Sequence, residues 1–148
     1  MCTSGAGMTT EETKRRISEY LGLSLGLFLS VHVSATSTEY DVRNGFSRLY
    51  YAFFHASLAF LLSQGEEIDA YRWTHGDVHT AIDRRMGKYL GRFLRELYRS
   101  RQKADYEPEF FNRSYGRDIE MARADARSLL NRANRNYYWI YNESRKAL

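Results

Sequence analysis

The sequence contains one cysteine and one proline among its 148 residues. Cys2 has no second cysteine to pair with, which excludes a disulfide framework and a cysteine metal site and fits a reducing compartment. It also falls in the small, polar stretch 1–8, for which we expect a disordered tail. Pro108 stands alone, so proline interrupts few of the helices that the rest of the sequence favours.

Long hydrophobic runs are also missing. The apolar run Leu21–Val33 contains glycine, serine and histidine, and it is shorter than the roughly 20 residues that a membrane-spanning helix needs. No basic segment stands directly before a cleavage site of the kind that ends a signal peptide. We therefore expect no membrane partner and a soluble, cytoplasmic protein.

The common motifs for phosphate binding and nucleophilic catalysis are absent. Neither GxGxxG nor GxxxxGK[ST] occurs, and no serine has a convincing catalytic partner. His75, His79 and Asp83 follow one another at intervals of four residues, so two imidazoles on one helix face could bind zinc. The spacing is not that of a metalloprotease, however, and His75 beside Thr74 also fits a helix start. We expect no metal and no other cofactor.

The sequence is rich in helical periodicity, and no long stretch alternates as a strand would. Apolar residues make up 43% and aromatic residues 15% of the chain, which is typical of a folded protein. We expect a single all-α domain over 9–148, an up-and-down helical bundle of four long helices plus a short helix. The expected helices cover about 9–32, 41–65, 75–86, 90–104 and 115–148.

The stretch Asp41–Gly65 has the strongest helical pattern, and Gly65 is suited to end a helix. Arg48 and His55 are seven residues apart, so they point to the same side of this helix, two turns from each other. The residues around them on that side are mostly alanines, so a second helix could approach closely. A cation and an imidazole on a face suited to close packing require an explanation.

Basic residues gather in the segment 84–105, which has eight of them against two acidic residues, in a chain of net charge +4. Such an excess favours a polyanion partner, although a solvated helix face is the alternative. Arg92, Arg95 and Arg99 are spaced three and four apart and form one stripe. With Tyr89 and Tyr98 beside it, the stripe could follow an RNA backbone and stack a base.

Three blocks of the sequence, SRLYYAFFHA at 47–56, Thr74-His75, and RQKADY at 101–106, together resemble the HEPN-domain family. Ser47–Ala56, which reads SRLYYAFFHA, is similar to the second helix of these proteins and is followed by Leu61-Leu62 and Gly65. Thr74-His75 comes after the next loop. Arg101–Tyr106, RQKADY, resembles the Arg-x-Lys-Ala-Asp-Tyr signature of one small bacterial and archaeal branch.

The resemblance implies an all-α bundle that forms a homodimer and is often encoded beside a minimal nucleotidyltransferase antitoxin. Many HEPN members are metal-independent ribonucleases. Their motif is an arginine and a histidine separated by four to six residues, and it lies beside its own copy across the dimer. Arg48 and His55 fit this pattern, so the resemblance makes them the catalytic pair of an RNA endonuclease toxin. A histidine can move the proton of a ribose hydroxyl, and an arginine can hold the phosphate. The expected RNA- or nucleotide-binding residues are Arg92, Arg95, Arg99, Arg101 and Tyr51.

One departure from the family keeps a second function open. In ribonuclease members the motif begins the later helix, where Arg101 stands here, yet no histidine follows Arg101. The domain is then either a nuclease that uses Arg48 and His55, or a non-catalytic module that binds nucleotide or RNA and regulates a nucleotidyltransferase. His75, Asp105 and Tyr106 are further motif residues, and the resemblance suggests Tyr106 as an acceptor of nucleotidyl transfer.

Purely structural roles are the alternatives for the same residues. His55 could be a buried imidazole bonded to a neighbouring helix, and Arg48 could pair with an acid such as Asp105. Arg101 and Asp105 are four residues apart and could form an ordinary ion pair on one helix.

Overall fold

The computed structural model describes residues 10–69, 72–107, 109, 115 and 118–148, and this part of the chain is helical with no strand. The predicted disordered tail, 1–8, lies outside the described residues. Within them, no helix is both long and apolar enough to cross a membrane. The predicted all-α class is confirmed.

The first two helices are α1 (Thr10–Leu29) and α2 (Glu39–Ser63). Helix α1 ends at Leu29, three residues before the predicted end at His32. At the observed end the Ser30 hydroxyl donates to the Leu27 carbonyl at 2.7 Å. Helix α2 begins two residues earlier than predicted because Thr38 and Asp41 form a capping box.

The end of α2 is fixed by Gly65, as predicted from the sequence. Gly65 has φ +82, and its N–H bonds the Leu62 carbonyl while the Glu66 N–H bonds the Leu61 carbonyl. This pair of bonds is a Schellman motif, which requires a left-handed residue at that position.

Helices α3 (His75–Met86) and α4 (Lys88–Tyr106) form a tight hairpin joined at Gly87, whose φ is +104. Thr74 caps α3, as predicted, with Asp77 completing a capping box. The two helices come so close that a Cβ placed on Gly91 would lie 1.7 Å from Asp83 Oδ1. Glycine is therefore required at position 91 for this packing.

The last helix, α6 (Ile119–Arg145), begins four residues after the predicted Tyr115. Its N-cap is Asp118, whose carboxylate accepts from the backbone N–H groups of Glu120 and Met121. A side-chain cap of this kind sets a helix start more sharply than apolar periodicity does.

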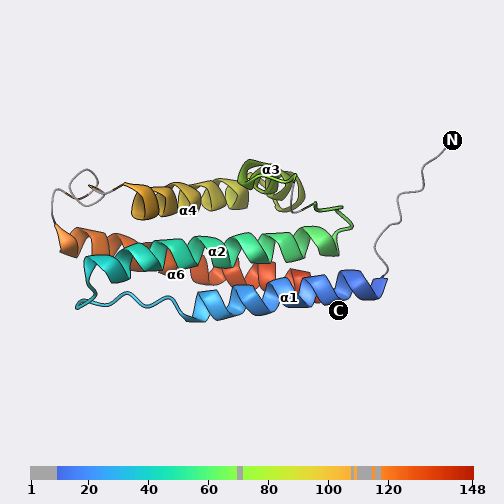
Figure 1. Ribbon diagram of the computed structural model, residues 1–148, viewed down its shortest axis with the longest axis horizontal. Helices are drawn as coiled ribbons and strands as arrows, with labels where there is room; N and C mark the ends of the chain where they lie inside the picture. The colour runs from blue at the N-terminus through green and yellow to red at the C-terminus, as the bar shows by residue number, and fades with distance from the viewer. Residues whose placement is uncertain (1–9, 70–71, 108, 110–114, 116–117) are drawn as a thin grey trace.

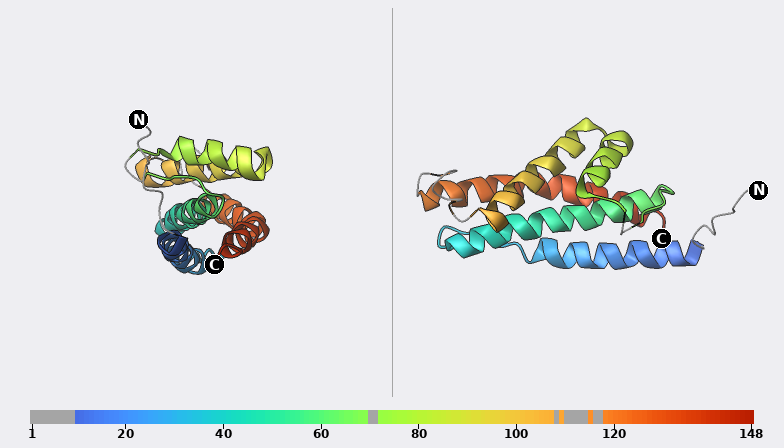
Figure 2. Two further views of the ribbon diagram at one scale, coloured as in Figure 1. Left: turned by 90° about the vertical axis from the view of Figure 1, so that its right-hand side faces the viewer. Right: turned by 45° about the horizontal axis from the view of Figure 1, so that its top comes forward.

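The four long helices run alternately up and down, and α2 lies at the centre (Figure 1). It packs against α1, α3, α4 and α6, and both views of Figure 2 show α1 and α4 on different sides of it. At the core, Ser24 of α1 donates to the Ala52 carbonyl of α2 at 2.6 Å and bonds the Tyr137 hydroxyl of α6 at 2.9 Å. The face of α2 between α1 and α4 is the one that carries Arg48, Tyr51 and His55.

Candidate functional site

Three residues of α2, spaced four apart, bind the C-terminal turn of α4. Arg43 donates to the carbonyls of Ala104 and Glu107 at 2.7 and 3.1 Å. Ser47 donates to Asp105 Oδ2 at 3.2 Å, and the Tyr51 hydroxyl accepts from Arg101 at 2.7 Å. Because residues four apart share a helix face, α2 presents one polar stripe that fixes the segment carrying the RQKADY signature.

Arg101 is the centre of this contact and is only 7% exposed. Its Nη2 donates to both Tyr51 and Tyr106, and its Nε lies 2.9 Å from Asp105 Oδ2, an ion pair without good hydrogen-bond alignment. Burial acts to lower the pKa of Arg101, but Tyr51, Tyr106 and Asp105 outweigh it, so the net shift is upward. The Arg101–Asp105 pair therefore exists, as the structural interpretation predicted, and the guanidinium is engaged by the protein.

A second buried cluster lies beside the first, around Tyr50. Its hydroxyl bonds His75 Nδ1 at 2.6 Å and His79 Nε2 at 3.1 Å. A hydroxyl carries one proton, so it donates to one ring and accepts from the other. Burial raises the pKa of Tyr50 and lowers that of His79 to about 4, with Arg95 contributing to the second shift. Both imidazoles are thus neutral polar links between α2 and α3.

His75 closes this cluster on the outer side. Its ring stacks on Tyr98 at 5.1 Å between centroids and lies 4.7 Å from the ring of Phe54. Burial and, to a smaller extent, Arg101 lower its pKa. One nitrogen of each ring, His75 Nδ1 and His79 Nε2, bonds Tyr50, and the described residues contain no group of three side chains suited to hold a metal.

His55 lies one turn beyond Tyr51 on the same face of α2. Its ring is half-buried and stacks on Tyr20 of α1 and on Tyr51, with centroids 6.0 and 6.2 Å away. Its Nδ1 is buried and has no hydrogen-bond partner, and burial lowers its pKa. The predicted hydrogen bond from His55 to a neighbouring helix does not form, because aromatic rings surround the imidazole.

Arg48 is exposed and donates to the Ser30 carbonyl just past the end of α1, at 3.2 Å. It does not pair with Asp105, whose carboxylate is held by Arg101 and Ser47. Arg48, Tyr51 and His55 therefore follow one another along α2 between α1 and α4. We call these three residues the Arg48–His55 stripe. At one end Arg48 bonds the Ser30 carbonyl, and at the other end His55 stacks on Tyr20.

The three arginines predicted as one stripe on α4 differ in their exposure and partners. Arg95 turns toward α3 and pairs with Asp83 at 2.6 Å. Arg92 and Arg99 are exposed, as is Tyr89 near the start of the same helix. Tyr98, the other ring predicted to stack a base, packs inward on His75 and His79.

Sequence reasoning found the signature residues but missed their partners. Arg43 and Ser47 precede Tyr51 at intervals of four, and this spacing could have identified the polar stripe. Tyr50 had no such signal, because it read as an ordinary member of a helical pattern, and His79 stood out only as a candidate zinc ligand beside His75.

Comparison with known proteins identifies no relative of this chain. No family model matches it, and no curated protein and no solved structure matches it at a significant level.

Proposed function

We propose that the protein is a HEPN-type, metal-independent endoribonuclease that acts as a homodimer. The observation that carries this proposal is His55: a half-buried imidazole with a lowered pKa, held by ring stacking and not by a hydrogen bond at its buried Nδ1, on the same face of α2 as Arg48. Elsewhere in the site the imidazoles are held by Tyr50, so His55 is the one suited to exchange a proton with a ligand.

The chemistry follows from the charge states of the two side chains. A histidine with a lowered pKa is neutral near pH 7 and can act as a base. It accepts the proton of a ribose 2′-hydroxyl, whose oxygen attacks the adjacent phosphorus while the bond from phosphorus to the 5′-oxygen breaks. Arg48 releases the Ser30 carbonyl and holds the phosphate oxygens as negative charge develops on them. The products are a 2′,3′-cyclic phosphate and a 5′-hydroxyl.

The second protomer completes this proposal. The leaving 5′-oxygen needs a proton, and it takes the one that His55 accepted from the 2′-hydroxyl, either directly or by exchange with the neutral imidazole in the partner's copy of the stripe. In the same proposal a minimal nucleotidyltransferase is the antitoxin, and Tyr106 is an acceptor of nucleotidyl transfer because it is 68% exposed at the end of α4.

A non-catalytic module is the second candidate, and Arg101 favours it. The guanidinium of the signature is already bonded to Tyr51, Tyr106 and Asp105, which supports a structural role for Arg101 over that of a phosphate ligand. In that case the exposed Arg48, Arg92 and Arg99 would bind RNA or nucleotide without cleaving it, in a protein that regulates a nucleotidyltransferase.

The deciding experiment is cleavage of single-stranded RNA in excess chelator by the wild type, Arg48→Ala and His55→Ala. Arg127→Ala and His32→Ala are matched controls, because both residues are exposed and lie outside the stripe. Loss of cleavage in the two stripe variants alone, with folding intact by circular dichroism, is the expected result. Cleavage by His55→Ala at the wild-type rate would refute the assignment. RNA binding without cleavage by the wild type would instead establish the non-catalytic module.

A further inference from the structure

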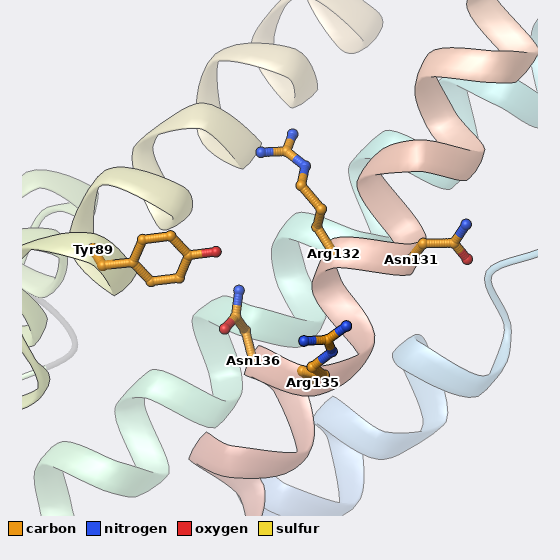
Figure 3. A pocket seen from close by; sticks show the side chains of 5 residues that line it. All are labelled: Tyr89, Asn131, Arg132, Arg135 and Asn136. Carbon is orange, nitrogen blue, oxygen red and sulfur yellow. The ribbon is translucent and has the colours of Figure 1, made fainter.

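A pocket of about 350 Å³ lies between α4 and α6 (Figure 3). Its wall on α4 is the ring of Tyr89, and its wall on α6 consists of two arginines and two asparagines. Tyr89, Arg132 and Asn136 turn toward the space between the two helices in Figure 3. A volume of this size suits a small ligand.

The two arginines of the pocket have different roles. Arg132 is held by Glu96 of α4 through two bonds, at 2.6 and 3.2 Å, and its guanidinium lies over the Phe93 ring at 5.5 Å. Glu96 neutralises this cation and fixes the distance between α4 and α6. Arg135, one residue from Asn136, is exposed and is the arginine that remains to receive an anion.

Tyr89 and Asn136 supply the other parts of a recognition site. Tyr89 is 62% exposed, so a large aromatic face is open to a planar ring from solution. A side-chain amide both donates and accepts, as the edge of a nucleobase does. An aromatic face, an amide and a guanidinium around one cavity match the base and the phosphate of a nucleotide.

We propose that this pocket binds one nucleotide unit, with the base on Tyr89, its edge at Asn136 and the phosphate at Arg135. The unit is either a free nucleoside monophosphate or one residue of a single-stranded RNA. Arg92 is exposed, lies three residues after Tyr89 on α4 and is placed to contact the next phosphate of such a strand. The site uses none of the residues of the Arg48–His55 stripe, so it does not rest on the proposed cleavage chemistry.

The test is calorimetric titration of the full chain with uridine and adenosine monophosphates, with an oligouridylate of about eight nucleotides, and with inorganic phosphate. The variants are Tyr89→Leu and Arg135→Glu. Arg127→Glu is the control, because it makes the same charge reversal at another exposed arginine of α6. We expect both pocket variants to weaken binding by about tenfold or more and the control to leave it within about twofold.

The two nucleotide sources are distinguished by which probe binds. Monophosphate binding that both pocket variants weaken identifies a free-nucleotide site, and oligouridylate binding alone with the same dependence identifies an RNA contact. The proposal is overturned if neither probe binds below about 5 mM, if binding survives in both variants, or if inorganic phosphate binds as tightly as the monophosphates. RNA cleavage by His55 can persist in any of these cases, so the two proposals fail separately.

Discussion

The guanidinium of Arg101 donates to the hydroxyl of Tyr51 at 2.7 Å, which joins the end of α4 to the middle of α2. The same nitrogen reaches Tyr106, and the carboxylate of Asp105 lies beside Nε. The signature at 101–106 is thereby a docking element: it holds the outer helix hairpin against the central helix and forms one edge of the Arg48–His55 stripe.

Arg101→Lys should destabilise the fold by about 1–3 kcal/mol, because a lysine ammonium cannot reach both tyrosines and Asp105 from one position. The exposed Arg99→Lys, two residues away, should change the free energy of unfolding by about 0.5 kcal/mol or less. Urea unfolding followed by circular dichroism measures both. Equal stabilities of the two variants would show that the Arg101 contacts contribute nothing specific.

Stability should rise with pH between about 4 and 6.5 and then level off. The pKa of His79 is lowered to about 4 in the fold, first by burial, whereas an unfolded histidine titrates near 6.5. The unfolded chain therefore binds more protons in this window. Lowering the pH from about 6.5 to 4 should reduce the free energy of unfolding by up to about 3 kcal/mol. His75, whose pKa is also lowered, acts in the same direction.

Thermal unfolding at pH 4.5 and 7.5 tests this dependence. His79→Gln keeps a polar side chain near Tyr50 but removes the titrating group, so its stability should vary less with pH than that of the wild type. A wild type that is as stable at pH 4.5 as at 7.5 would contradict the lowered pKa of His79.

Gly91→Ala should destabilise the protein by about 1–3 kcal/mol, because the new methyl group would overlap the Asp83 side chain. Asp83 cannot easily move away, since it is paired with Arg95 at 2.6 Å. Gly26→Ala is the matched control: it also lies inside a helix, but its Cβ would meet nothing within 4 Å. That variant should gain up to about 1 kcal/mol from helix propensity. Chemical denaturation gives both values, and a stabilised Gly91→Ala would disprove the close contact.

The imidazole of His55 should titrate below the usual pH of 6.5, because burial lowers its pKa. Tyr20 covers one face of the ring, so Tyr20→Ala should raise this pKa toward the normal value. Proton NMR follows the titration, with the His55 signal assigned by its loss in His55→Ala. If cleavage is observed, its rate should rise with pH through the same pKa and become constant near neutrality. An unchanged pKa in Tyr20→Ala would show that the ring is not shielded by α1.

The fold was largely predictable because its signals are local. Apolar periodicity indicated every helix described, and Gly65 and Thr74 set two of the boundaries where the sequence placed them. The C-terminal end of α1 and the starts of α2 and α6 were predicted less well, because the Ser30 side chain and the caps at Thr38 and Asp118 decide them within a single turn. Periodicity averages over several turns and cannot locate such a boundary.

By itself the sequence determined an all-helical chain, the shared face of Arg48 and His55, and the basic character of the segment 84–105. Only the tertiary structure decided which of these side chains have hydrogen-bond or ion-pair partners within the protein. It engaged Arg101 with Tyr51 and Tyr106, placed Arg95 on Asp83, and left His55 Nδ1 without a partner. The physical reason is that helical spacing fixes the direction of a side chain, whereas its charge state and partners depend on residues from other helices, 50 positions away in the case of Arg101 and Tyr51.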